Sequence, residues 1–126
     1  MMLLALVMAA SLTGCQATDG DSIRCGDERI RLLGIDAPEM GRCPPQRRCA
    51  DGDPVASRDN LRRRIAGRAI RVERIKKDRY GRTIAVVTAG GANLSCLQLS
   101  GHHATYRRDW DDGLRVARAC RDMARR

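Results

Sequence analysis

The feature that most constrains the fold is the spacing of turn residues in the first third of the chain. Asp19-Gly20-Asp21 separates two short strand-like segments, residues 14–18 and 22–25, and acidic residues around a glycine at such a position are typical of a β-hairpin. Gly26-Asp27-Glu28 predicts a second turn, and the Arg-Ile-Arg-Leu alternation after it predicts a third strand over residues 29–35. Three short strands joined by tight turns predict a hairpin-connected sheet.

Helices and further strands follow. A loop rich in Pro, Gly, Arg and Cys over residues 40–53 precedes a helix with Asp53 at its N-cap, Pro54 at its first position and Gly67 at its end. The buried side of this helix is expected to carry Val55, Leu61 and Ile65. The later elements are strands at residues 68–75 and 82–88 and helices at residues 93–100 and 112–123. This order predicts an α+β fold, mainly β, in which helices pack around a small closed barrel.

The composition limits both the core and the partners. A chain of 126 residues has room for one domain with a modest core. With no Phe, one Trp and two Tyr, that core must be built from Leu, Ile, Val and Ala. The net charge of +9 favours an anionic partner, either nucleic acid or an acidic membrane surface. Nothing in the sequence implies a protein partner, and we expect a monomer.

Residues 1–14 carry no charged side chain and predict the apolar part of an export signal, which leaves a mature domain over residues 15–126. The segment is too short to span a bilayer as a helix, and no Lys or Arg precedes it. Two alternatives stay open, since Leu-Thr-Gly before Cys15 also fits a lipoprotein signal and the segment could contribute to the first strand. The protein is therefore expected to be periplasmic or secreted, or anchored to a membrane through a lipidated Cys15.

The six cysteines form an even set in a small, exported chain, which favours disulfides. None belongs to a C-x-x-C pair, so a zinc site is a poor interpretation. Cys15 and Cys25 each lie five residues from Gly20, and a hairpin turning there would place them opposite each other. The expected pairs are Cys15–Cys25, Cys43–Cys49 and Cys96–Cys120, and lipidation of Cys15 would break this scheme.

Acidic residues lie at two strand ends that the hairpins can bring together. Asp21 follows the first turn, and Asp36 and Glu39 follow the third strand. Carboxylate oxygens of this kind suit calcium or magnesium. The alternative is that Asp19 and Asp21 are ordinary turn formers and that Pro38 simply ends a strand.

The basic residues are concentrated. Residues 62–82 contain ten basic side chains against two acidic ones, which is either a solvated face or a footprint for a phosphate backbone. Arg31 lies within an apolar strand near the acids, and Arg82 opens a later strand. Arginine forks bind phosphate oxygens in pairs, although each of these residues alone could be a surface ion pair. Trp110 is expected to pack beneath the last helix, with stacking on a base as the alternative.

Three segments resemble the staphylococcal nuclease family, also called thermonuclease or micrococcal nuclease. These are DGDSI, RIRLLGIDAPE and DRYGRTIAVV, in this order and at these separations. GANLSCLQLSGHHATYRR resembles the family's segment around its second helix, so the resemblance covers roughly residues 14–126. It implies a five-stranded Greek-key barrel of the OB type with about three packed helices.

The resemblance also implies one calcium ion. Asp21 and Asp36 match the family's calcium-binding carboxylates, and Ala37 matches the position that offers a backbone carbonyl. Asp19 matches a turn acid beside the metal.

The remaining matches concern the substrate. Glu39 matches the carboxylate that positions or deprotonates the attacking water, and Arg31 and Arg82 match the arginines that hold the scissile phosphate. Tyr80 and Tyr106 fall at or near tyrosines that line the nucleotide pocket. The leading hypothesis is thus an exported calcium-dependent nuclease that hydrolyses DNA, RNA or both. The alternatives are an inactive OB-fold nucleic-acid-binding module and a disulfide-stapled envelope protein that binds anionic surfaces.

Overall fold

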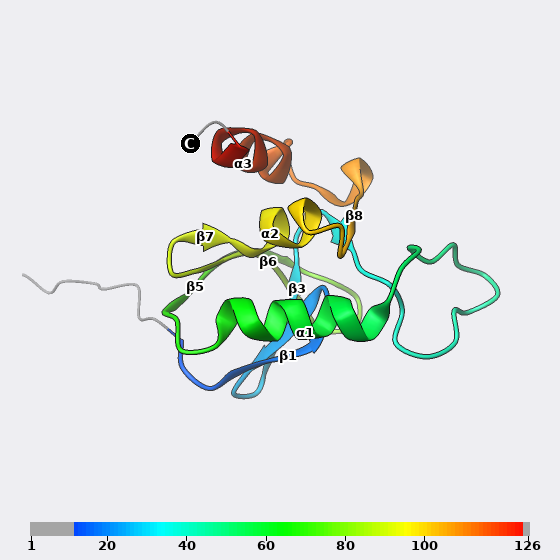
Figure 1. Ribbon diagram of the computed structural model, residues 1–126, viewed down its shortest axis with the longest axis horizontal. Helices are drawn as coiled ribbons and strands as arrows, with labels where there is room; N and C mark the ends of the chain where they lie inside the picture. Colours follow the sequence, from blue (N-terminus) through cyan, green and yellow to red (C-terminus); the bar gives the residue numbers. More distant parts are fainter. Residues whose placement is uncertain (1–11, 125–126) are drawn as a thin grey trace, which may run out of the picture.

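The computed structural model describes residues 12–124, which form an α+β fold (Figure 1). The predicted export segment therefore lies outside the described residues except for its last three positions. The helices are α1 (Pro54–Ile65), α2 (Leu94–Ser100) and α3 (Arg115–Ala124), with a short 3₁₀ turn at Arg108–Trp110. The strands are β1 (Cys15–Asp19), β2 (Ser22–Cys25), β3 (Glu28–Leu32), β4 (Ile35–Asp36), β5 (Ile70–Lys77), β6 (Thr83–Ala89), β7 (Ala92–Asn93) and β8 (Thr105–Tyr106).

The main sheet has the order β1-β2-β3-β6-β5, with β7 paired to β6, and β4 pairs separately with β8. All pairs are antiparallel except β3 with β6, where Ile30 lies opposite Thr83. This arrangement confirms the α+β, OB-like fold, but the expected barrel closure is wrong. The outer edges meet at one bridge, where the Leu12 amide donates to the Ile70 carbonyl at 2.9 Å, so over residues 12–124 the sheet is not a closed barrel.

The core is aliphatic, as the composition predicts. Strand β6 alternates between buried and half-exposed residues, because one of its faces packs on the core. Helix α1 lies alongside β1 (Figure 1) and contributes Leu61 and Ile65, while Arg62, Arg63 and Arg64 are exposed. The largest apolar side chains that are fully buried are Ile23, Ile30, Leu32, Leu33, Ile35, Leu61, Leu94, Val87 and Val116.

Helix α1 begins and ends where the sequence predicts. The Asp53 side chain accepts hydrogen bonds from the amides of Val55 and Ala56, and Pro54 is the first helical residue. The expectation that Val55 is buried is wrong, because its side chain is 46% exposed. Two of the four buried positions of the helix are instead taken by the polar residues Ser57 and Asn60.

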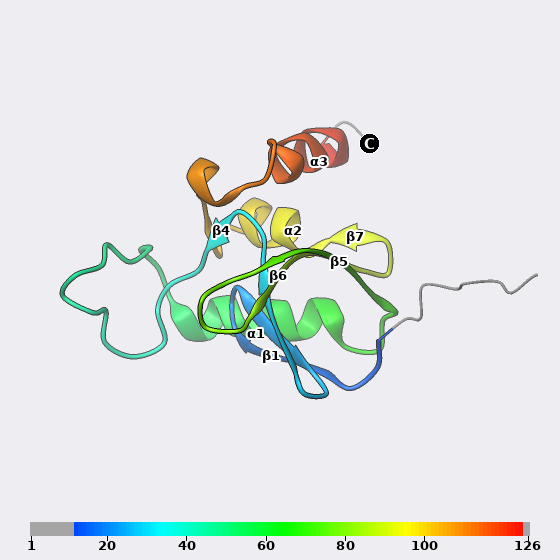
Figure 2. The same cartoon turned by 180° about the vertical axis from the view of Figure 1, so that it is seen from behind.

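Three disulfides cross-link the described residues, at the pairs expected from the sequence. Cys15–Cys25 joins opposite residues of the β1–β2 hairpin, and Cys96–Cys120 joins α2 to α3. Cys43–Cys49 closes part of the long loop between β4 and α1, which projects from the body of the molecule in both views (Figures 1 and 2). In the described part of the chain, no helix is long and apolar enough to cross a membrane.

Candidate active site

The Asp19-Gly20-Asp21 turn packs tightly against the segment that follows β4. The Asp21 carboxylate accepts hydrogen bonds from the Ala37 amide at 2.9 Å and from the Ser22 hydroxyl at 3.0 Å. Gly20 has no room for a side chain, because a Cβ atom there would lie 1.8 Å from Ser57 Oγ. The ends of two strands, fifteen or more residues apart in the sequence, are thereby held together.

Arg31 of β3 lies between the buried acids. Its side chain is 12% exposed, and Nη2 lies 3.6 Å from Asp21 Oδ2 and 3.8 Å from Asp36 Oδ1. Gly34 turns the chain after β3 with a φ of +76°, a conformation that favours glycine, and β4 then carries the fully buried Asp36.

A small polar cavity of about 50 Å³ lies between these elements. Most of the residues expected to form the site line it, and Asp36 lies beside it. The remaining lining is the peptide segment of Pro38 and Met40 and one residue that the sequence did not single out, Arg47. The predicted residues that line the cavity are Asp19, Asp21, Arg31, Ala37, Glu39 and Arg82.

Arg82 is oriented by Asp78. The guanidinium Nε donates to Asp78 Oδ2 at 2.8 Å, and Asp78 Oδ1 accepts from the amides of Tyr80 and Arg82, both at 2.9 Å. One carboxylate therefore both shapes the turn between β5 and β6 and fixes the direction of the arginine. The four-residue spacing of Asp78 and Arg82 is the sequence signal for this contact.

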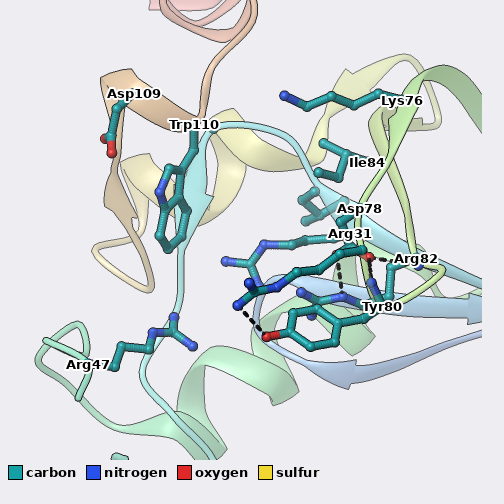
Figure 3. A pocket seen from close by; sticks show the side chains of 12 residues that line it. Arg31, Arg47, Lys76, Asp78, Tyr80, Arg82, Ile84, Asp109 and Trp110 are labelled. Atoms are coloured by element: carbon teal, nitrogen blue, oxygen red, sulfur yellow. Dashed lines mark hydrogen bonds and ion pairs between the residues drawn. The ribbon is translucent and has the colours of Figure 1, made fainter.

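A larger cavity of about 370 Å³ adjoins the polar one, because Arg31, Arg47 and Arg82 line both. Tyr80, whose side chain is 59% exposed, lies beside Arg82 at its wall (Figure 3). Trp110 lies across the cavity from Tyr80 in the same view. The cavity thus combines cationic and aromatic groups, as a site for a nucleotide does.

Tyr106 is placed differently from Tyr80. It belongs to β8, opposite Ile35, and its hydroxyl donates to Asp111 at 2.7 Å. It is not among the residues that line the larger cavity. The aromatic residue from this part of the chain that does line it is Trp110, whose ring centroid lies 4.5 Å from the guanidinium carbon of Arg107. The expectation that Trp110 packs beneath the last helix missed this position.

Two of the acids, Asp19 and Asp36, have pKa values raised above the ordinary value for aspartate. Burial raises the pKa of the Asp36 carboxyl above its ordinary value, and this effect exceeds the opposing influence of the Arg47 guanidinium. Burial, together with the charges of Asp21 and Glu39, raises the pKa of Asp19. Additional positive charge near these carboxyls would favour their ionised forms.

The donor set fits a hard cation such as calcium. Asp36 Oδ2 is buried and has no hydrogen-bond partner, and carboxylate and carbonyl oxygens are the ligands that calcium prefers. The oxygens are not gathered around one point, because within residues 12–124 no three acidic, histidine or cysteine side chains form a cluster that could hold an ion. Arginine side chains lie among them instead.

A comparison with protein families decides the relationship. The model of the family described as staphylococcal nuclease homologue matches residues 29–109. The chain belongs to the staphylococcal nuclease family. A comparison with curated proteins found no match. Membership of this family indicates a nuclease-type function with nucleic acid as the substrate.

The staphylococcal nuclease match covers only part of the cavity. It includes Arg31, Asp36, Glu39 and Arg82, whereas the turn with Asp21 precedes the matched residues. The tertiary structure supplies the missing connection through the hydrogen bond from Ala37 to Asp21. The family match and the geometry therefore point to the same part of the molecule.

Proposed function

We propose that the protein is a calcium-dependent phosphodiesterase that hydrolyses DNA, RNA or both by attack of water on a backbone phosphate. The observation that carries the proposal is the convergence of Asp21, Glu39, Arg31 and Arg82 on one polar cavity. That cavity opens beside a larger one with aromatic walls. This combination offers separate places for a phosphate and for a base.

The two arginines bind and orient the phosphodiester. Arg31 is held in β3 beside the acids, and Arg82 is directed by Asp78, so both guanidinium groups are positioned before substrate arrives. Such groups stabilise the charge that accumulates on phosphoryl oxygens during the reaction. A bound calcium ion, held by Asp21, Asp36 and the Ala37 carbonyl, would supply further neutralisation of that charge.

Glu39 orients the attacking water. Its side chain is 36% exposed and reaches the polar cavity, so solvent can enter beside it. A carboxylate there accepts a hydrogen bond from the attacking water, and this bond directs a lone pair of the water oxygen toward the phosphorus atom. Tyr80 supplies an exposed aromatic face near the phosphate for a base or sugar of the substrate.

A cleavage assay on single-stranded DNA tests the proposal. Cleavage should require calcium, stop in chelator, and fall sharply in Asp36→Asn and Arg82→Ala. Asp27→Ala and Arg71→Ala are matched controls, since both residues are exposed and neither lines either cavity. DNA binding without calcium-dependent cleavage would identify an inactive binding module, and cleavage unchanged in both site variants would refute the site assignment.

We also propose that the protein is exported. Three disulfides in a chain of 126 residues indicate an oxidising compartment. The bond between Cys15 and Cys25 uses the thiol that lipidation would need, so the disulfide-bonded and lipidated forms exclude each other. Intact mass and a thiol count on protein from its native host distinguish them, because lipidation would leave Cys25 as a free thiol.

A further inference from the structure

Arg47 lies inside the candidate active site although it comes from the long loop between β4 and α1. Its guanidinium donates from Nη2 to Asp36 Oδ1 at 2.7 Å and from Nη1 to Glu39 Oε2 at 3.2 Å. The Cys43–Cys49 disulfide closes the loop segment that carries it. Figure 3 shows Arg47 across the larger cavity from Tyr80 and Arg82.

These contacts are made to carboxylates that the proposed function assigns to other partners, although Asp36 Oδ2 keeps no hydrogen-bond partner while Arg47 holds Oδ1. Asp36 is proposed to hold the cation and Glu39 the water, yet one guanidinium bonds to both. A guanidinium and a divalent cation compete directly for a carboxylate, since each neutralises the same charge. Arg47 therefore opposes cation binding at Asp36 through its positive charge, and it holds the Glu39 oxygen that would otherwise accept from water.

The charge balance indicates that Arg47 stays at the site when cation and substrate bind. Four carboxylates and three guanidinium groups at the polar cavity leave one formal negative charge. A divalent cation and one phosphodiester together bring this charge to zero while Arg47 stays in place. The third arginine near Asp36, Arg107, also pairs with Asp109 at 3.7 Å.

Arg47 can move from the two acids to a substrate phosphate without leaving the site. It lines both cavities together with Arg31 and Arg82, the proposed phosphate ligands. The disulfide limits how far the loop can carry its side chain away. Its side chain is 35% exposed, so it is less confined than Arg31.

We propose that Arg47 is a third phosphate-binding arginine that exchanges partners. It pairs with Asp36 and Glu39 before calcium binds, and it turns to the substrate phosphate when calcium binds Asp36 and water binds Glu39. This inference rests on the proposed function. It adds a binding residue from a disulfide-closed loop to the two arginines of the β-strands.

Calorimetry on the intact, oxidised protein tests both halves of the exchange. Calcium is titrated into nucleotide-free protein, and thymidine 5′-monophosphate is titrated into calcium-saturated protein. Arg47→Ala should bind calcium several-fold more tightly, because a competitor is removed, and should bind the nucleotide roughly tenfold more weakly, because a charge-assisted contact is lost. Arg48→Ala is the matched control, since Arg48 is the exposed neighbour in the same loop, and should change neither constant.

Equal or weaker calcium binding by Arg47→Ala would overturn the competition, and unchanged nucleotide binding would overturn the phosphate contact. Thermal unfolding of each variant identifies a loss of binding that comes from misfolding. A wild-type protein that neither binds calcium nor cleaves DNA refutes the proposed function itself. If the wild-type protein cleaves DNA in a calcium-dependent way but Arg47→Ala and Arg48→Ala bind calcium and nucleotide equally well, only the exchange of partners by Arg47 is refuted.

Discussion

The side-chain amide of Gln98 donates a hydrogen bond to the carbonyl of Gly20 at 2.6 Å, across 78 positions of sequence. Gln98 is fully buried in α2, and the same nitrogen donates to the Ser57 carbonyl at 3.0 Å, while its oxygen accepts from Asn60 at 2.6 Å. One side chain thus ties the turn with the two acids to both α1 and α2. The stability of the site depends on this buried polar contact.

Replacing Gln98 with leucine should destabilise the protein by at least about 2 kcal/mol, because the buried carbonyls of Gly20 and Ser57 lose their donor and Asn60 loses its acceptor. Chemical denaturation measures the change. Gln16→Leu is the control, since Gln16 is exposed in β1, and its effect should be within about 0.5 kcal/mol. Equal stabilities of the two variants would contradict a structural role for the contact.

Replacing Asp78 with asparagine should lower kcat/KM on DNA roughly ten- to hundredfold with little change in Tm, because Arg82 loses its charged partner and its orientation. Asparagine keeps an oxygen for the two amides that shape the turn. Steady-state kinetics and thermal unfolding measure the two effects. A variant that loses stability and activity in parallel would show that Asp78 acts only through the fold.

The Glu28–Arg74 pair should make stability dependent on pH in the acid range. Hydrogen bonds from Arg74 lower the pKa of Glu28 from 4.5 to about 2, so the contribution is fully present above pH 4.5 and is lost as pH falls toward 2. Because the side chain of Arg74 is 52% exposed, solvent screening limits the effect to about 1 kcal/mol. Glu28→Gln should therefore be less stable than wild type at pH 7 and equal to it near pH 2. Denaturation from pH 7 to pH 2 measures whether the free energies of unfolding of wild type and Glu28→Gln become equal. A stability difference that does not change with pH would refute the ionic origin of the effect.

Removing the Cys96–Cys120 disulfide by paired alanine substitution should cost about 3 kcal/mol, because it closes the largest loop, with a sequence separation of 24. The same change at Cys43 and Cys49, with a separation of 6, should cost about 2 kcal/mol. Denaturation of both pairs under oxidising conditions gives the order. If loss of Cys43–Cys49 cost more than loss of Cys96–Cys120, that bond would stabilise the protein by more than its effect on the entropy of the unfolded chain.

Local signals in the sequence predicted most of the fold. The Asp-Gly-Asp turn, the Asp53 cap and the Arg-Ile-Arg-Leu alternation in β3 each act over a few residues, and the structure has a hairpin, a helix start and a half-buried strand at these places. The prediction of a closed barrel was wrong because closure depends on whether the two outer edges of the sheet, distant in the sequence, pair along their whole length. Over the described residues they meet only between Leu12 and Ile70.

The candidate site divides in the same way. The sequence by itself singled out Asp21, Arg31 and Arg82 as candidate site residues, because residue type and order along the strands carry the family pattern. The structure places all three at one cavity, and the family match covers residues 29–109. Only the tertiary structure decided that Arg47 reaches Asp36, that Gln98 holds the acidic turn and that Trp110 rather than Tyr106 lines the larger cavity. These contacts join elements far apart in the chain, and their geometry depends on how helices and loops pack onto the sheet.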